Sequence, residues 1–142
     1  MSYFKWFEAH ANKHRAIMSR LIAQNYTQEA ILDYFTFDNM CLFEPDFCPL
    51  YATKTPCHPI THLNCYLCAC PNFRFNDNGL RNEGHKCVKS DCAIHARGHR
   101  WFEYEDILHL DCTACYIPHT KGFIKKRFHE DWNVVMKECS VQ

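Results

Sequence analysis

The chain has 142 residues, of which 47% are hydrophobic and 15% aromatic, so it can bury a core and is too apolar for a disordered protein. Sixteen basic residues balance sixteen acidic ones, so its overall charge gives no reason to expect nucleic acid or an anionic membrane as a partner. The N-terminus is charged where a signal peptide is apolar, and no run of about 18 apolar residues occurs. We expect a single domain, residues 1–142, that is cytoplasmic and has no membrane segment.

Residues 1–40 contain no cysteine and are predicted to form N-terminal helices arranged as a hairpin. In the first helix, apolar or weakly polar side chains recur every three or four residues, which is typical of an amphipathic helix. The second helix follows Thr27, a good N-cap, and turns Ile31, Leu32 and Phe35 inward. The stripe of the first helix consists of Phe4, Phe7, Ala11, His14, Met18 and Leu21.

Residues 41–119 contain ten of the eleven cysteines and all six prolines. Prolines at this density favour loops and turns, and they argue against long helices or a regular sheet. Interactions other than the backbone hydrogen bonds of helices and sheets must therefore hold this region together. We interpret it as a cysteine-rich metal-binding core.

Residues 120–142 are predicted to contain a C-terminal helix, from about residue 120 to 137. Apolar residues such as Phe123, Ile124 and Trp132 share one face of it, and charged residues cover the rest. Cys139 follows the helix and is predicted to be an ordinary thiol. The expected fold is thus a small irregular metal-stabilised α+β domain, with a loop-rich cysteine/histidine centre between an N-terminal helical hairpin and a C-terminal helix.

Two segments of the centre repeat one pattern: "HLNCYLCACP" at residues 62–71 and "HLDCTACYIP" at residues 109–118. A Cys-x-x-Cys turn lets two sulfurs reach the same ion, and eleven cysteines in an unexported protein favour metal ligands over disulfides. We therefore predict ligation by Cys65, Cys68, Cys112 and Cys115. Two such turns can close one four-thiolate site, as in a zinc ribbon, although these two are further apart than in most ribbons.

Further candidate ligands flank both turns: Cys57, His58, Cys70 and His119. Together with the paired cysteines they make eight donors, enough for two four-coordinate sites or for one iron–sulfur cluster with spectators. A three-ligand site with an open position would contain His58 or His119. The repeated histidines and His14 are interpreted as packing groups instead. Weaker candidates, with no paired turn, are Cys87, Cys92 and His95.

Three blocks, "PCH" at 56–58, "CYLCACP" at 65–71 and "DCTACYIPH" at 111–119, resemble the cysteine-rich small domain, a family of short prokaryotic proteins. The resemblance covers about residues 48–120 and implies metal binding without an assigned reaction. Carried over block by block, it implies the ligands Cys57, His58, Cys65, Cys68, Cys70, Cys112, Cys115 and His119.

The function predicted from these residues is metal binding, as a zinc-stabilised interaction or accessory module with one or two Cys/His sites and a protein partner. The alternative is an iron–sulfur protein acting in electron transfer, redox sensing or cluster-dependent catalysis. Histidines in the matched pattern and the paired turns favour zinc. An enzyme is less expected, because the chain has no glycine-rich phosphate loop, serine nucleophile motif or His-Glu-x-x-His segment.

Overall fold

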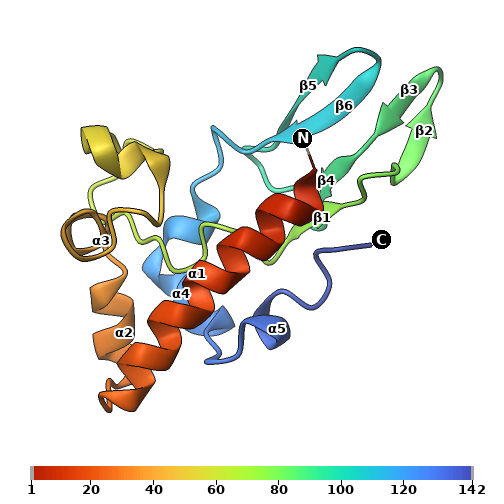
Figure 1. Ribbon diagram of the computed structural model, residues 1–142. Coiled ribbons are helices and arrows are strands. Elements are labelled where there is room, and N and C mark those ends of the chain that lie inside the picture. The colour runs from red at the N-terminus through yellow and green to blue at the C-terminus, as the bar shows by residue number, and fades with distance from the viewer. Residues whose placement is uncertain (1, 142) are drawn as a thin grey trace.

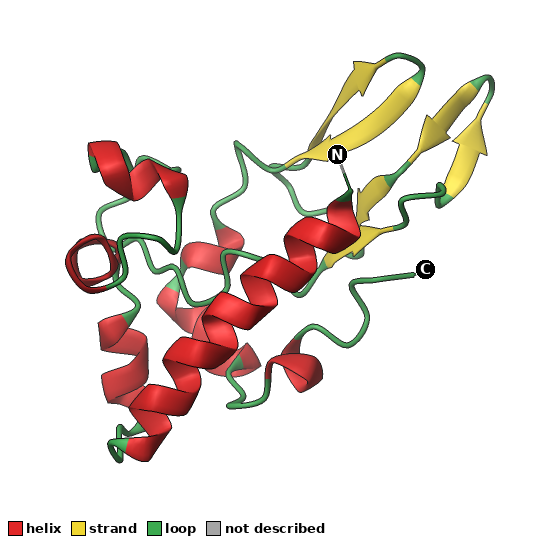
Figure 2. Cartoon of the chain, viewed as in Figure 1, coloured by secondary structure: helices red, strands yellow, loops and turns green. Residues whose placement is uncertain are grey.

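The computed structural model describes residues 2–141, so the two ends of the predicted domain, Met1 and Gln142, lie outside the described residues. The described chain is a small α+β fold (Figures 1 and 2). Its helices are α1 (Tyr3–Ala23), α2 (Gln28–Tyr34), α3 (Phe37–Phe43), α4 (Lys121–Arg127) and α5 (Trp132–Val135), with 3-10 turns η1 (Pro49–Thr53) and η2 (Ile117–His119). Its strands are β1 (Phe73–Phe75), β2 (Arg81–Glu83), β3 (Lys86–Val88), β4 (Ser90–Cys92), β5 (Arg100–Tyr104) and β6 (Ile107–Asp111).

Helix α1 runs along the molecule, with both sheets near its N-terminus and α2 and α3 towards its other end (Figure 1). The two predicted N-terminal helices are confirmed. Ser2 caps α1 by accepting from the amide of Lys5, and Thr27 caps α2 by accepting from the amide of Ala30. Helix α3 is an additional element that the sequence prediction lacked.

The prediction against a regular sheet is wrong for residues 73–111. Strands β1 and β4 form an antiparallel pair, and a four-stranded sheet has the order β2-β3-β6-β5, in which β3 and β6 are parallel. Glu105 and Asp106, between β5 and β6, both have positive φ, as a tight hairpin turn requires. Neither is the glycine or asparagine that usually marks such a turn, and most of these strands have only three residues, so the pattern was hard to detect.

The main core packs α1 against α2, the first repeated segment and the C-terminal region. Its largest fully buried side chains include Phe35, Tyr66 and Leu21. His14 is also buried there, where its ring lies against Phe35 and Trp132 and its Nε2–H donates to the carbonyl of Tyr66 at 3.0 Å. The interpretation of His14 as a core residue is therefore confirmed.

The single C-terminal helix is also a wrong prediction, because α4 ends at Arg127 and α5 starts only at Trp132. Side chains between them take over the local backbone hydrogen bonds: His129 Nδ1 accepts from the amide of Asp131, and the Asp131 carboxylate accepts from the amide of Asn133. The carbonyl of His129 accepts instead from the Tyr66 hydroxyl. The core thus fixes the break in the helix.

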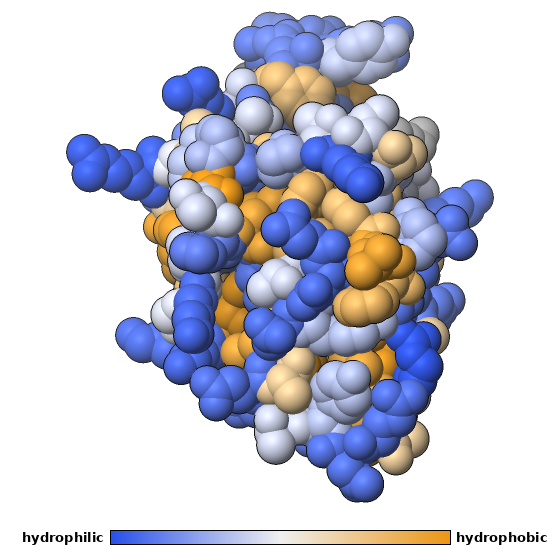
Figure 3. All heavy atoms as spheres, turned by 90° about the vertical axis from the view of Figure 1, so that its left-hand side faces the viewer, coloured by the Kyte–Doolittle hydropathy of each residue, from blue (hydrophilic) through white to orange (hydrophobic). Residues whose placement is uncertain are grey.

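The surface on the α2 and α3 side mixes apolar with hydrophilic residues (Figure 3). On α3, at the end of the molecule away from the sheets, Leu42 and Phe43 are large apolar side chains exposed to solvent. Among the described helices, none is both long and apolar enough to cross a membrane.

Candidate metal centre

Both repeated segments fold into the same turn. The amide of Cys68 donates to the carbonyl of Cys65 at 3.3 Å, and the amide of Cys115 donates to the carbonyl of Cys112 at 3.0 Å. We call these the first turn and the second turn. In each turn, this backbone hydrogen bond joins the two cysteines of one short loop.

The residue before each turn explains why the repeat carries an asparagine or an aspartate there. The Asn64 side-chain oxygen accepts from the amide of Tyr66 at 2.9 Å, and the Asp111 carboxylate accepts from the amide of Thr113 at 2.9 Å. A short side chain that accepts a hydrogen bond from the amide two residues ahead can fix such a turn by itself. The repeat therefore encodes a local backbone shape as well as a set of thiols.

The closest group of donor atoms among the described residues joins Cys57, His58 and His119, and we call it the Cys/His group. Its three ligand atoms all lie within 4.8 Å of one another. Cys57 Sγ is 3.0 Å from Nδ1 of His58 and 3.7 Å from Nε2 of His119. Both histidines are buried while Cys57 is exposed, so the group can be reached from solvent at the thiol.

Each histidine of the group is held by a backbone carbonyl at its other ring nitrogen. Nε2 of His58 lies 3.2 Å from the carbonyl oxygen of Cys112, and Nδ1 of His119 lies 2.8 Å from that of Asn64. A carbonyl oxygen can only accept, so these nitrogens carry the hydrogens. In each neutral ring, the nitrogen that faces Cys57 therefore has a free lone pair, which is the form that binds a metal.

Burial favours the uncharged forms of Cys57 and His119. It raises the pKa of the Cys57 thiol, with Cys48 adding to the effect, and it lowers the pKa of His119, with His58 contributing. A metal ion supplies the positive charge that makes a thiolate favourable in such a place, and the thiol proton leaves when the ion binds. The group has the chemistry of a metal ligand set.

The thiols of the first turn lie next to this group but outside it. Burial raises the pKa of Cys65 to about 12, and nearby Cys57 and Cys48 add to the shift. Cys68 Sγ is 3.7 Å from Nε2 of His10 on α1. Sequence reasoning missed both Cys48 and His10. For His10 a signal existed, because it lies one helical turn before the buried His14.

The structure separates the remaining predicted ligands into those that line one cavity and those that do not. Cys70 and the second turn line a cavity of about 370 Å³, and Cys92 lines it too. His95 lies at the surface beside Asp91, and Cys87 lies on β3, so neither lines that cavity. Cys139 is a buried thiol that donates to the carbonyls of Cys70 and Pro71.

All eleven cysteines, which fall within the described residues, are free thiols. No protein-family model, curated protein or solved structure matches this chain. What its own residues show is a cysteine-rich α+β fold with a Cys/His group that could hold a metal ion.

Proposed function

We propose that the protein binds one zinc ion through Cys57, His58 and His119. The observation that carries the proposal is the pair of histidines whose outer nitrogens donate to backbone carbonyls, so that both inner nitrogens offer lone pairs towards Cys57. Metal-binding histidines are held in this way in most sites, because the second hydrogen bond fixes both the tautomer and the ring orientation.

The distances within the Cys/His group suit zinc. In a tetrahedral site with Zn–S about 2.3 Å and Zn–N about 2.0 Å, sulfur and nitrogen lie about 3.6 Å apart. The sulfur of Cys57 is 3.0 Å and 3.7 Å from the two nitrogens, so a small adjustment admits the ion. A mixed sulfur and imidazole set is typical of zinc, and three protein donors leave a fourth position for water or another ligand.

The family resemblance supports the same site. Cys57 and His58 form the Pro-Cys-His block at 56–58, and His119 ends the block at 111–119. The fold brings these two separate blocks together at the Cys/His group. The zinc ion would then stabilise the loops of the centre, and the protein would serve as an accessory or interaction module for a protein partner in the cytoplasm.

Metal analysis of site variants tests this proposal. Purified full-length protein should contain zinc, and Cys57→Ser and His119→Ala should each weaken zinc binding by more than about 100-fold, since even outer partners of ligands are worth about 10- to 100-fold. Cys57 is exposed, so its serine variant disturbs packing least. The matched control is His62→Ala, which removes the exposed repeated histidine before the first turn and should leave zinc content unchanged. Full zinc content in Cys57→Ser and His119→Ala would refute the proposed site.

A further inference from the structure

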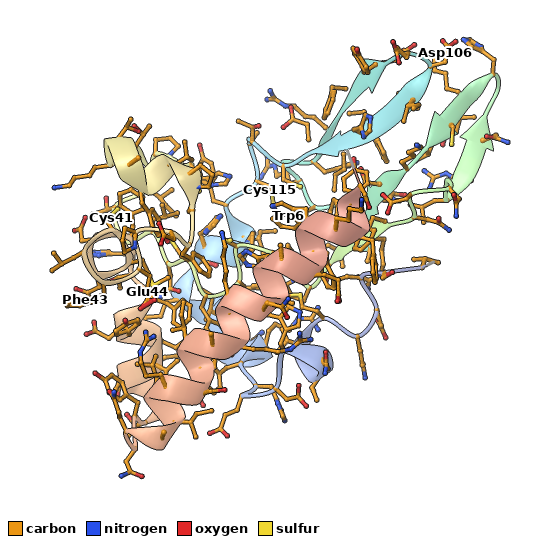
Figure 4. The ribbon with its side chains drawn as sticks, viewed as in Figure 1. Trp6, Cys41, Phe43, Glu44, Asp106 and Cys115 are labelled. Carbon is orange, nitrogen blue, oxygen red and sulfur yellow. The ribbon has the colours of Figure 1, made fainter. Side chains whose placement is uncertain are left out.

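A second set of donors lines the same cavity as His58 and His119 of the Cys/His group. Cys70, Cys92, Cys112 and Cys115, which we call the four-thiol set, all line this cavity of about 370 Å³. Figure 4 shows Cys115 close to Trp6 in the N-terminal half of α1, and both residues line the cavity. Cys68 lines the cavity too, but its sulfur lies 3.7 Å from Nε2 of His10, so we leave it out of the set. The other four cysteines come from three distant stretches of chain and face one space.

Pairing of β1 with β4 brings Cys70 and Cys92 to this cavity. Phe73, three residues after Cys70, is opposite Cys92 in the register of the two strands, and the amide of Ala93 donates to the carbonyl of Asn72 at 2.8 Å. No spacing rule in the sequence links these two cysteines, which explains why Cys92 was only a weak candidate.

Close backbone packing brings the second turn to the same place. A side chain at Gly98 would put its Cβ 2.3 Å from the carbonyl oxygen of Ala114, so the loop after β4 lies directly on the second turn. Cys92 and Cys115 are both buried and share a small apolar cluster with Leu110. The strands and this loop together fix all four cysteines.

Backbone amides already point at two of the four sulfurs. The amide of Asn72 donates to Cys70 Sγ, and the amide of Ala96 donates to Cys92 Sγ, both at 3.4 Å. Amide hydrogen bonds to sulfur stabilise thiolates bound to metal and tune the potential of iron–sulfur clusters. Burial raises the pKa of Cys112 to about 12, with Cys70, Cys115 and Cys92 adding to the shift, so a bound cation would be needed to make the Cys112 thiolate favourable.

The spacing of the set favours a cluster over a single ion. A single zinc ion with Zn–S of about 2.3 Å needs sulfurs about 3.8 Å apart. Among the described residues, the Cys/His group alone has three donor atoms all within 4.8 Å of one another. No three sulfurs of the four-thiol set are therefore that close. In a [4Fe–4S] cluster each thiolate binds a different iron, so the sulfurs stand further apart around a central volume.

The walls of the cavity suit a cluster as well. Apolar side chains form most of the lining apart from the sulfurs and histidines; they include Phe7, Phe73, Ile94, Leu110 and Ile117. An apolar shell keeps water from a cluster and sets its potential. Cys112 is the exposed member of the set, so one edge faces solvent.

We propose that Cys70, Cys92, Cys112 and Cys115 hold a [4Fe–4S] cluster in this cavity. The cluster is additional to the zinc ion and shares no ligand with it, although His58 and His119 also line the cavity and the carbonyl of Cys112 accepts from His58. Its exposed edge at Cys112 is the side from which a redox partner protein would exchange one electron with it.

The test is anaerobic reconstitution of the full-length protein with ferrous iron and sulfide, followed by analysis of iron, acid-labile sulfide and zinc in each sample. We expect about four irons and four sulfides per chain, with a brown colour that bleaches on addition of dithionite and an electron paramagnetic resonance signal from the reduced sample. Cys92→Ser and Cys112→Ser should lose the iron and sulfide while keeping zinc. Cys87→Ser, a cysteine on β3 that does not line the cavity, should keep both.

The pattern of losses separates this proposal from the zinc site. A colourless wild-type protein after reconstitution, or one with a second zinc ion in place of iron, would overturn the cluster and leave the zinc site intact. Unchanged iron and sulfide in both serine variants would overturn the assignment of ligands. Cys112 is exposed, so its variant remains informative through circular dichroism and iron content even where Cys92→Ser does not fold. Failure of the zinc site alone would change zinc content only.

Discussion

Gly98→Ala should damage the second turn through one added methyl group. The new Cβ would lie 2.3 Å from the carbonyl oxygen of Ala114 and 2.9 Å from the Cα of Cys115, where a normal contact is about 3.5 Å. Backbone must therefore move by about 1 Å, because no flexible side chain is there to give way. Overpacking of this kind costs about 2 to 3 kcal/mol, which lowers the melting temperature of a chain of this size by about 6 to 12 °C.

The matched control is Gly122→Ala in α4, where an added Cβ would meet nothing within 4 Å. Alanine is the better helix former by up to about 1 kcal/mol, so this variant should melt at or slightly above the temperature of the wild type. Thermal denaturation followed by circular dichroism, with iron and zinc analysis of the same samples, measures both effects. Gly98→Ala should also retain less iron, because the second turn would shift.

A Gly98→Ala protein that melts within about 1 °C of the wild type and keeps its metal would refute the reasoning. It would mean that the loop after β4 does not lie against the second turn, and the convergence of the four-thiol set would lose its main geometric support.

Two further predictions concern stability. Ser90→Ala removes the fully buried hydroxyl that accepts from the amide of Leu110 at 2.7 Å, so the free energy of unfolding measured with urea should fall by about 1 to 3 kcal/mol. Ser19 is exposed, so Ser19→Ala is the control. An equal loss of stability in both variants would contradict the contact between Ser90 and Leu110. Burial lowers the pKa of His14 to about 3, so the folded state keeps it neutral while the unfolded chain takes up a proton below about pH 6.5. Stability is therefore lost as pH falls from about 6.5 towards 3, by about 2 kcal/mol between pH 7.5 and pH 5. In His14→Leu the loss of stability between these two pH values should be smaller by that amount. An identical pH profile in the two proteins would show that His14 is not buried neutral beside Tyr66.

Helices with local signals were predictable from the sequence, and elements set by distant contacts were not. Thr27 caps α2 as expected because its side chain and the amide it binds are three residues apart. The end of α4 depends on Tyr66, which donates to the carbonyl of His129 from 63 residues away. Hydrophobic periodicity continues through that break, so the sequence pattern alone predicted one long helix.

The candidate site shows the same division. The Cys-x-x-Cys segments are local, and in each of them the amide of the second cysteine donates to the carbonyl of the first. Which thiols share a space is a property of the tertiary fold. Cys92 reaches Cys70 only through pairing of β1 with β4, and no count of intervening residues reveals that.

The zinc ion proposed for the Cys/His group would also be a long-range cross-link. Cys57 and His119 are 62 positions apart, and tying them together in the unfolded chain would cost about 4 kcal/mol in chain entropy on the scale used for disulfides. Such an ion would act like a disulfide that can be removed, because a chelator entering at the exposed thiol of Cys57 would take away this cross-link between residues 57 and 119.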